Sequence, residues 1–283
     1  MGHYTFEKQV TDWGKMNKFR RNKYMQTKKP TGLAKLWREI KRPFGQLKCW
    51  YRWSLLGHDE LVRSVQWSIS TAVLHQKTFT PFKNIHHGQE IVLVAIGPSA
   101  KDYKRIDGAI HIGVNRAFQI ENINLRYLFM QDYGVKPYLK EANQYNPESC
   151  TKFYGLLEWE PTIIPESDAI EANALRYTTD CKQFYKRWRF SYAIDSEPLG
   201  DFRSIVFPAM QFALWTNPRT IYLVGCDCSE GYFDGQVGTT RGSRFIRPWI
   251  HLKEFAQIHY PEIEIKSINP VGLKGVFNEH KQT

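Results

Sequence analysis

The sequence lacks the features that identify several large classes of protein. It has no run of eighteen or more apolar residues, and its longest apolar stretches, such as Ile91 to Ile96, are only as long as a strand, so we expect no transmembrane helix. Its amino terminus lacks the apolar core of a secretory signal, which predicts a chain that stays in the cytoplasm. Neither G-x-G-x-x-G nor G-x-x-x-x-G-K-[ST] occurs, which argues against nicotinamide enzymes and P-loop nucleotidases.

Signals for disulfides and metals are also weak. The cysteine count is odd, and the spacing is not that of a zinc site, so we expect reduced thiols. The adjacent His86 and His87 are typical of a polar linker rather than of a ligand pair. We therefore predict no metal site, with Mg²⁺ beside a diphosphate as the alternative. The five cysteines are Cys49, Cys150, Cys181, Cys226 and Cys228.

Positive charge is concentrated at the amino end. Residues 1–52 carry fourteen Lys and Arg against three Asp and Glu, which accounts for the whole net charge of +11. Residues 33–42 have helical periodicity with a basic face, which favours an anionic membrane surface as the partner of residues 1–45. A helical subdomain packed on the core is the alternative, and we favour it for residues 46–80. No recognised motif supports a nucleic-acid partner.

From about residue 89 the sequence has the pattern of alternating strands and helices. Near-continuous apolar runs at 91–96, 110–115, 125–132 and 221–227 predict buried parallel strands, with a further strand at 263–268. Helices are expected from Ser99, over 205–215 and over 248–259, and weaker strands at 152–157 and 162–164. Alternating strands and helices predict an α/β domain. We expect a Rossmann-like, mostly parallel sheet with helices on both faces (a GT-A-like variant) over residues 86–283, after a basic helical segment over residues 1–85.

Small and polar residues stand at the predicted carboxyl ends of these strands, where open α/β sheets bind ligands. Glycine allows close backbone approach, proline suits a first helical turn, and serine can cap a helix whose free N–H groups then face a phosphate. We predict a nucleotide site there. Its candidate residues are Gly97, Pro98, Ser99, Asn115, Asp132, Gly225, Asp227 and Ser229.

Three blocks of sequence carry a family resemblance. IVLVAIGPSAKDY with IHIGVNRAF, then FPAMQFALWTNPRTIYLVGCDCSEGYFDG, and finally YPEIEIKSINPVGLKGVF resemble bacterial sialyltransferases of glycosyltransferase family 42. They also resemble related Rossmann-like proteins that include archaeal pterin pyrophosphokinases. The chain departs from the family's pattern at Ala95, where the family has glycine, and at Ser229, where it has its first phosphate-binding tyrosine.

The resemblance implies inverting transfer of a CMP-activated sugar acid to a surface-glycan or lipid-linked acceptor. It implies that Tyr232 contacts the departing phosphate and that a histidine before the last helix is the general base. His251 is our candidate, although the family's spacing falls near residues 243–244. Asp227, Asp234 and Asp132 are rival bases, because carboxylates serve this role in many other glycosyltransferases. Arg244 and Arg247 are candidates for neutralising a phosphate or a sugar carboxylate.

Three functions therefore remain open. The first is a cytoplasmic glycosyltransferase held at the inner face of the cell membrane by its basic segment. The second is a Mg²⁺-dependent pyrophosphokinase-like nucleotide enzyme. The third is a non-catalytic nucleotide-binding scaffold. The basic segment favours the first, because a soluble pterin enzyme gains nothing from attraction to a membrane.

Overall fold

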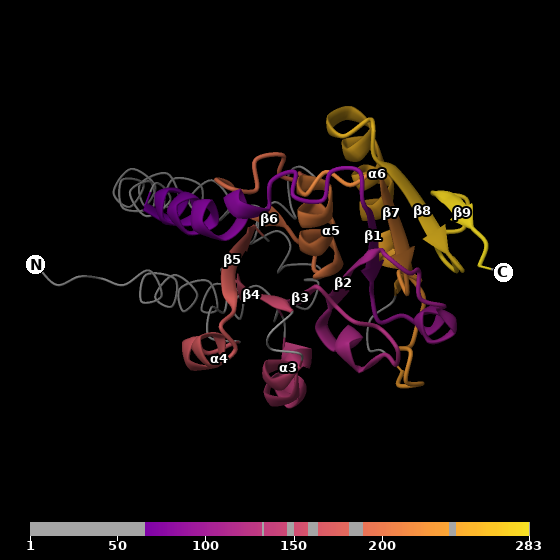
Figure 1. Ribbon diagram of the computed structural model, residues 1–283, viewed down its shortest axis with the longest axis horizontal. Helices are drawn as coiled ribbons and strands as arrows, with labels where there is room; N and C mark the ends of the chain where they lie inside the picture. Colours follow the sequence, from indigo (N-terminus) through magenta and orange to yellow (C-terminus); the bar gives the residue numbers. More distant parts are fainter. Residues whose placement is uncertain are drawn as a thin grey trace, which may run out of the picture.

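The computed structural model describes residues 66–131, 133–145, 150–157, 164–180, 189–237 and 242–282. Within these residues the chain forms one parallel sheet in the order β6-β5-β4-β3-β2-β1-β7-β8-β9 (Figure 1). This is the predicted Rossmann-like α/β arrangement. The strands are β1 (Glu90–Val94), β2 (Ile110–Val114), β3 (Tyr127–Met130), β4 (Thr151–Leu157), β5 (Leu175–Asp180), β6 (Leu199–Gly200), β7 (Thr220–Val224), β8 (Glu264–Ile268) and β9 (Asn278–His280).

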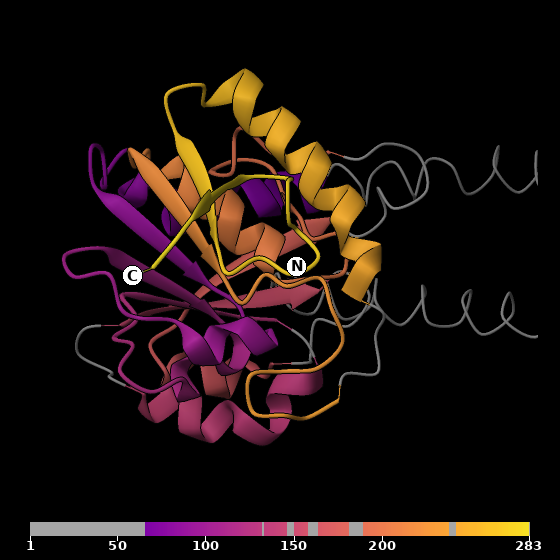
Figure 2. The ribbon, with the colours of Figure 1, turned by 90° about the vertical axis from the view of Figure 1, so that its right-hand side faces the viewer.

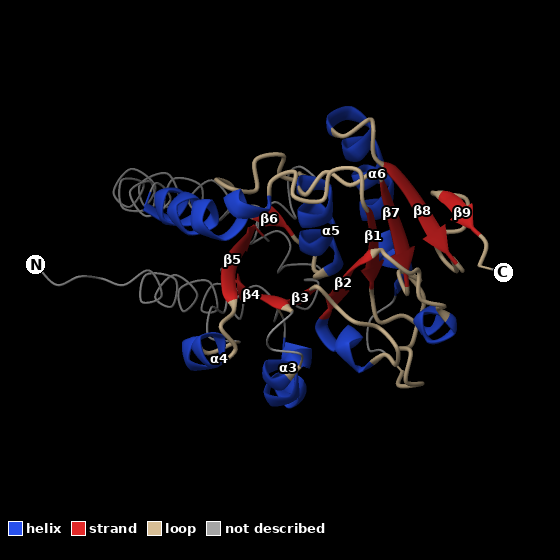
Figure 3. Cartoon of the chain, in the orientation of Figure 1, coloured by secondary structure: helices blue, strands red, loops and turns tan. Residues whose placement is uncertain are grey.

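Helices cover the sheet on both faces (Figure 3). One face carries a helix over residues 66–79 together with α5 (Val206–Trp215) and α6 (Ile246–His259). The other carries α3 (Leu139–Gln144) and α4 (Glu166–Glu171). Short 3-10 helices span Thr80–Phe82, Pro98–Asp102, Asn115–Gln119, Tyr133–Tyr138 and Gly242–Phe245.

This coverage explains the apolar runs of the central strands. Along β1, Ile91 and Leu93 point into the core shared with α5, whereas Val92 and Val94 point into the core on the opposite face. Both faces of the strand are buried, so polar and apolar residues do not alternate along it. The expected strands at 91–96, 110–115, 125–132, 152–157, 221–227 and 263–268 are confirmed with small shifts at their ends.

The helix over residues 66–79 belongs to the core of the sheet. Phe79 is fully buried, stacks on Phe153, and its carbonyl accepts the indole N–H of Trp215 at 2.9 Å. The packing on the core that we expected of residues 46–80 is therefore found over residues 66–79. These residues belong to the segment 1–85 that we had separated from the α/β domain. Residues 1–65, including the predicted membrane contact of 1–45, lie outside the described residues.

Two expectations about local structure differ from what the structure shows. The helix expected from Ser99 is a five-residue 3-10 helix, Pro98–Asp102. Ile164, the only described residue of the strand expected at 162–164, lies in a bend. In addition, β5, β6 and β9 were not expected.

Candidate functional site

A cavity opens at the carboxyl ends of β1, β2 and β7. The chain leaves β1 toward β2 on one side, while β7 pairs with β1 on the other, so the connections diverge at this point (Figure 2). Such a switch point is where open α/β sheets bind ligands. The cavity has a volume of about 230 Å³, and the residues before α5 and at the start of α6 also line it. We call it the switch-point cavity.

Seven of the predicted site residues line this cavity. They come from sequence segments far apart, which shows that the strand ends were placed correctly on one edge of the sheet. The seven are Gly97, Asn115, Gly225, Asp227, Ser229, Tyr232 and Arg244.

Gly97 and Gly225 allow the loops after β1 and β7 to touch. The Gly97 N–H donates to the Gly225 carbonyl at 2.9 Å. A Cβ at Gly97 would lie 2.4 Å from that carbonyl oxygen, and one at Gly225 would lie 2.5 Å from the oxygen of Ala95. Gly225 also has a φ of 64°, a region that L side chains rarely adopt. Any larger residue would push the two loops apart.

Asp227 joins the same two loops through its side chain. It is 3% exposed, and its carboxylate accepts the Ser99 N–H at 2.7 Å and the Ser99 hydroxyl at short range. Burial raises the pKa of Asp227, and the two hydrogen bonds from Ser99 oppose that rise. The contact corrects the role expected for Ser99: its amide is bound to Asp227 and does not line the cavity.

Arg203 is a cavity residue that the sequence analysis missed. It lines the cavity just before α5 and has a φ of 63°, next to Phe202 at 43°. Left-handed conformations cost non-glycine residues about 1–2 kcal/mol each. Asp201 stabilises this turn, because its carboxylate accepts the Arg203 N–H at 3.0 Å and its carbonyl accepts the Ser204 N–H at 2.7 Å. Asp201 and Ser204 before the apolar run of α5 were the available signal for this turn.

The cationic wall of the cavity includes Arg244. Its pKa is lowered, first by burial and then by the charge of Arg203, so the two guanidinium groups lie within electrostatic range. The start of α5 has no acidic residue in its first turn and no side-chain cap, and a helix start carries partial positive charge. Ser204, Ile205 and Val206 line the cavity at this end. This wall suits an anionic group.

Asn115 and Tyr232 also line the cavity. Asn115 begins the 3-10 helix Asn115–Gln119 with a φ of 48°. Tyr232 lies next to the buried Arg116, whose guanidinium is 5.2 Å from the centre of the tyrosine ring. Arg116 also forms an ion pair with Asp234. Asp234, a predicted base, is therefore bound to Arg116 and does not line the cavity.

The structure does not bring the other predicted residues that it describes to the cavity. His251 lines a separate groove, where its Nδ1 is 3.3 Å from Glu254. Arg247, in the first turn of α6, is exposed and is not part of the lining. Pro98 begins the 3-10 helix behind the lining, and Asp132 lies outside the described residues.

Two further findings concern the described part of the chain. No group of three or more His, Cys, Asp or Glu side chains there is arranged to hold a metal ion. None of the helices described is both long and apolar enough to cross a membrane.

Comparisons with known proteins give fold-level likeness only. No protein-family model and no curated protein matches the chain. A MAf glycosyltransferase from Magnetospirillum magneticum AMB-1 is similar over 75% of this chain at 16% identity and a TM-score of 0.44, and this chain spans 38% of that protein. An α-2,3-sialyltransferase from Campylobacter jejuni is similar over 64% of this chain and 75% of its own length, at 14% identity and a TM-score of 0.38. Likeness at this level adds nothing to what the cavity residues indicate.

Proposed function

We propose that the protein is a glycosyltransferase whose switch-point cavity binds a nucleotide-activated sugar. The observation that carries the proposal is the convergence of Gly97, Asn115, Asp227 and Tyr232 on one cavity. These residues come from separate blocks of the sequence resemblance to family 42. Parallel pairing of β1 with β2 and β7 brings the strand ends together, but packing alone gives no reason for these small and polar residue types there.

The charge of the cavity supports an anionic donor. Arg203, Arg244 and the start of α5 supply positive potential on one wall, and charge-assisted hydrogen bonds from guanidinium groups suit phosphates and carboxylates. A CMP-activated sugar acid carries both groups. We therefore propose it as the donor, with transfer that inverts the anomeric centre.

Asp227 is our proposed general base. Of the predicted bases that the structure describes, it alone lines the cavity, and a base works best when its pKa approaches the working pH. Burial shifts the pKa of Asp227 upward in that direction. The bonds from Ser99 fix the carboxylate and leave further lone pairs available to an acceptor hydroxyl.

Thermal shift with CMP, UMP, GMP and ATP, each with and without Mg²⁺, tests the donor class. We expect CMP to raise the melting temperature without metal. Arg244→Ala should abolish most of this shift, whereas Arg247→Ala, a matched arginine outside the lining, should retain it. Stabilisation by ATP only with Mg²⁺ would support the pyrophosphokinase alternative, and equal loss in both variants would contradict the assigned wall.

Turnover of a CMP-activated sugar acid tests the base. Asp227→Asn preserves an acceptor for the Ser99 N–H but removes the base, so we expect kcat to fall by about 10²–10⁴. Ser99→Ala loses one of the same hydrogen bonds while keeping the carboxylate, and should lower kcat far less. Equal losses in the two variants would assign Asp227 a structural role only.

We also propose that the basic segment holds the enzyme beside lipid-linked acceptors at an anionic membrane. The charge of +11 over residues 1–52 supports this. Binding to vesicles that contain phosphatidylglycerol should weaken with salt and disappear when residues 1–45 are deleted. Unchanged binding after that deletion would exclude the segment as the anchor.

A further inference from the structure

A second hollow lies along α6, outside the switch-point cavity. It has a volume of about 520 Å³ and runs between α6 and the segment 189–197, which we call the Tyr192 loop. Trp249 lines the switch-point cavity, and His251, two residues further along α6, lines the groove. The two hollows therefore share one helix. The groove is lined by Arg189, Phe190, Tyr192, Ala193, Glu197, His251, Glu254, Phe255, Ile258 and His259.

One wall of the groove is an exposed aromatic surface. Tyr192 is 53% exposed, and its ring packs against His259 and Tyr260 with centroids 5.1 and 5.5 Å apart. His259 also packs against Phe255, at 4.7 Å. The ring of Tyr192 is supported from behind while much of it faces water. Such a surface suits the C–H face of a sugar ring, because an aromatic ring buries apolar area with a defined geometry.

Charged groups border this aromatic wall. Arg189 donates to both carboxylate oxygens of Glu197 at 2.8 and 3.0 Å, and His251 lies 3.3 Å from the carboxylate of Glu254. Both carboxylates keep part of their surface in water, with Glu197 39% and Glu254 61% exposed. Their remaining lone pairs can accept hydroxyl donors. The paired charges leave the groove without a strong excess of either sign.

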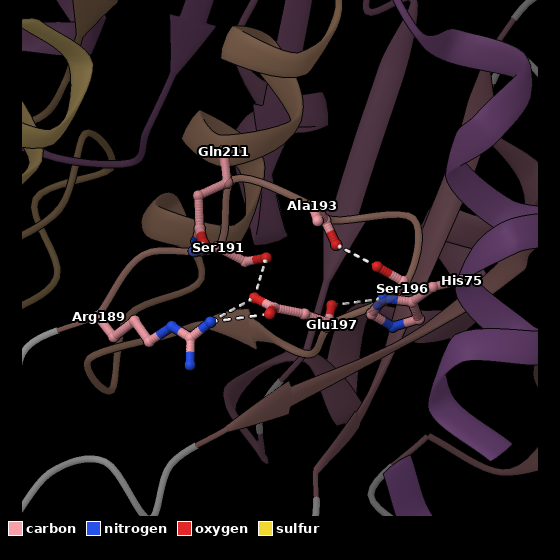
Figure 4. Close-up of polar contacts among 7 residues, drawn as sticks. All are labelled: His75, Arg189, Ser191, Ala193, Ser196, Glu197 and Gln211. Carbon is pink, nitrogen blue, oxygen red and sulfur yellow. Dashed lines mark hydrogen bonds and ion pairs between the residues drawn. The ribbon is translucent and has the colours of Figure 1, made fainter. Parts of the chain in front are cut away.

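Buried hydrogen bonds hold the Tyr192 loop in place (Figure 4). The Gln211 side chain, on α5, accepts the Ser191 N–H at 2.8 Å. His75 lies 2.9 Å from the carbonyls of both Ile194 and Glu197. The Ser191 hydroxyl donates to Glu197 at 3.1 Å. A surface loop fixed by core residues loses little entropy on binding.

We propose that this groove binds an oligosaccharide, and specifically the acceptor glycan. A supported aromatic face with flanking carboxylates and a fixed backbone matches a neutral, hydroxyl-rich ligand better than a phosphate or a metal ion. Residues 251, 254, 255 and 258 form one face of α6, and about 1.5 Å of rise per residue gives the groove room for more than one sugar ring. That the bound glycan is the acceptor rests on the transferase function proposed above. That the groove binds a glycan does not depend on that function.

Binding of the full-length protein to a printed array of neutral and acidic oligosaccharides, two to six sugars long, tests this directly. We expect selective binding that Tyr192→Phe retains, because the aromatic face remains. Tyr192→Ala should weaken binding about tenfold, the equivalent of about 1.4 kcal/mol of stacking, and Glu254→Gln should narrow the set of glycans bound. The control Ile170→Ala removes an exposed apolar residue on α4, on the opposite face of the sheet, and should change nothing.

Three results would overturn the proposal: no glycan bound by the wild type, equal binding by Tyr192→Ala, or a change of mass by light scattering in Tyr192→Ala, which would make the groove a contact between copies. Thermal shift with CMP on the same variants separates the two proposals. A retained CMP response without glycan binding rejects the groove alone. Glycan binding without any CMP response rejects the transferase and keeps the groove.

Discussion

His75 is a buried, neutral histidine that should make the free energy of unfolding decrease at acid pH, and replacing it with asparagine should remove this pH dependence. The Thr178 N–H donates to Nε2 of His75 at 2.8 Å, so Nε2 is the acceptor and Nδ1 carries the proton. That Nδ1–H then donates to the carbonyls of Ile194 and Glu197. A second proton on Nε2 would face the N–H of Thr178, and its nearest acceptor would be the Thr178 hydroxyl at 3.1 Å. Burial lowers the pKa of His75 from 6.5 to about 4, although the backbone hydrogen bonds oppose the shift.

The magnitude follows from linkage. In the unfolded chain His75 binds a proton near pH 6.5, whereas in the folded chain it stays neutral until about pH 4. Its contribution to stability is therefore complete above pH 6.5 and decreases as the pH is lowered. Down to pH 4 the loss is about 3 kcal/mol, at about 1.4 kcal/mol for each pH unit. Burial lowers the pKa of His111 to about 4 as well, so wild type should lose roughly twice this amount.

His75→Asn keeps a donor where Nδ1 lies but leaves the Thr178 N–H without its acceptor. We expect a cost of about 3 kcal/mol at pH 7, from an unsatisfied buried donor and a small cavity. Urea unfolding at pH 7, 6, 5 and 4, followed by circular dichroism, measures the difference between variant and wild type. That difference should close to near zero at pH 4. A difference that stays constant across the series would refute the neutral assignment.

Three further predictions concern the backbone around the two hollows, each measured as the change in urea unfolding free energy at pH 7. Gly97→Ala should cost about 2 kcal/mol or more, because its Cβ overlaps the Gly225 carbonyl, whereas Gly108→Ala, with open space around it and a φ of 77°, should cost about 1 kcal/mol; equal costs would rule out the loop contact. Asp201→Ala should cost about 2–3 kcal/mol, because the Arg203 N–H and the buried Gln131 and Thr179 side chains all lose their acceptor; a cost below about 0.5 kcal/mol would show that these bonds are unimportant. Gln211→Leu should cost about 1–3 kcal/mol by removing the acceptor of the Ser191 N–H and should also weaken glycan binding; a stable variant with full glycan binding would show that the loop needs no such anchor.

Long apolar runs made the central strands of the sheet predictable. The strands β5, β6 and β9, nearer its edges, lack such runs and were not predicted. β1 and β7 are continuous in apolar residues because both of their faces are covered. β5 contains the buried polar residues Thr178 and Thr179, β6 has two residues, and β9 is a polar edge strand. None of these three carries the apolar periodicity from which a strand is predicted.

The site residues also fall into those that the sequence could predict and those that it could not. Gly97, Asn115 and Asp227 were predictable because each follows a recognisable strand. The bond between Ser99 and Asp227 spans 128 residues of sequence, so local pattern could not indicate that this amide is occupied. Arg203 follows β6, a two-residue strand that no sequence pattern indicates, and only the path of the chain back across the sheet brings it to the cavity.

The pairing of β1 with β7 has a consequence for the order in which the protein matures. Leu93 lies beside Leu223 in the sheet, although 130 residues separate them, and contacts between distant segments form slowly because a large loop must close first. During synthesis β1 to β5 leave the ribosome and can associate before β7 exists. Asp227 follows β7, so the wall it contributes is completed late. Recognition of a nucleotide should therefore be among the last properties gained in refolding, after most secondary structure has returned.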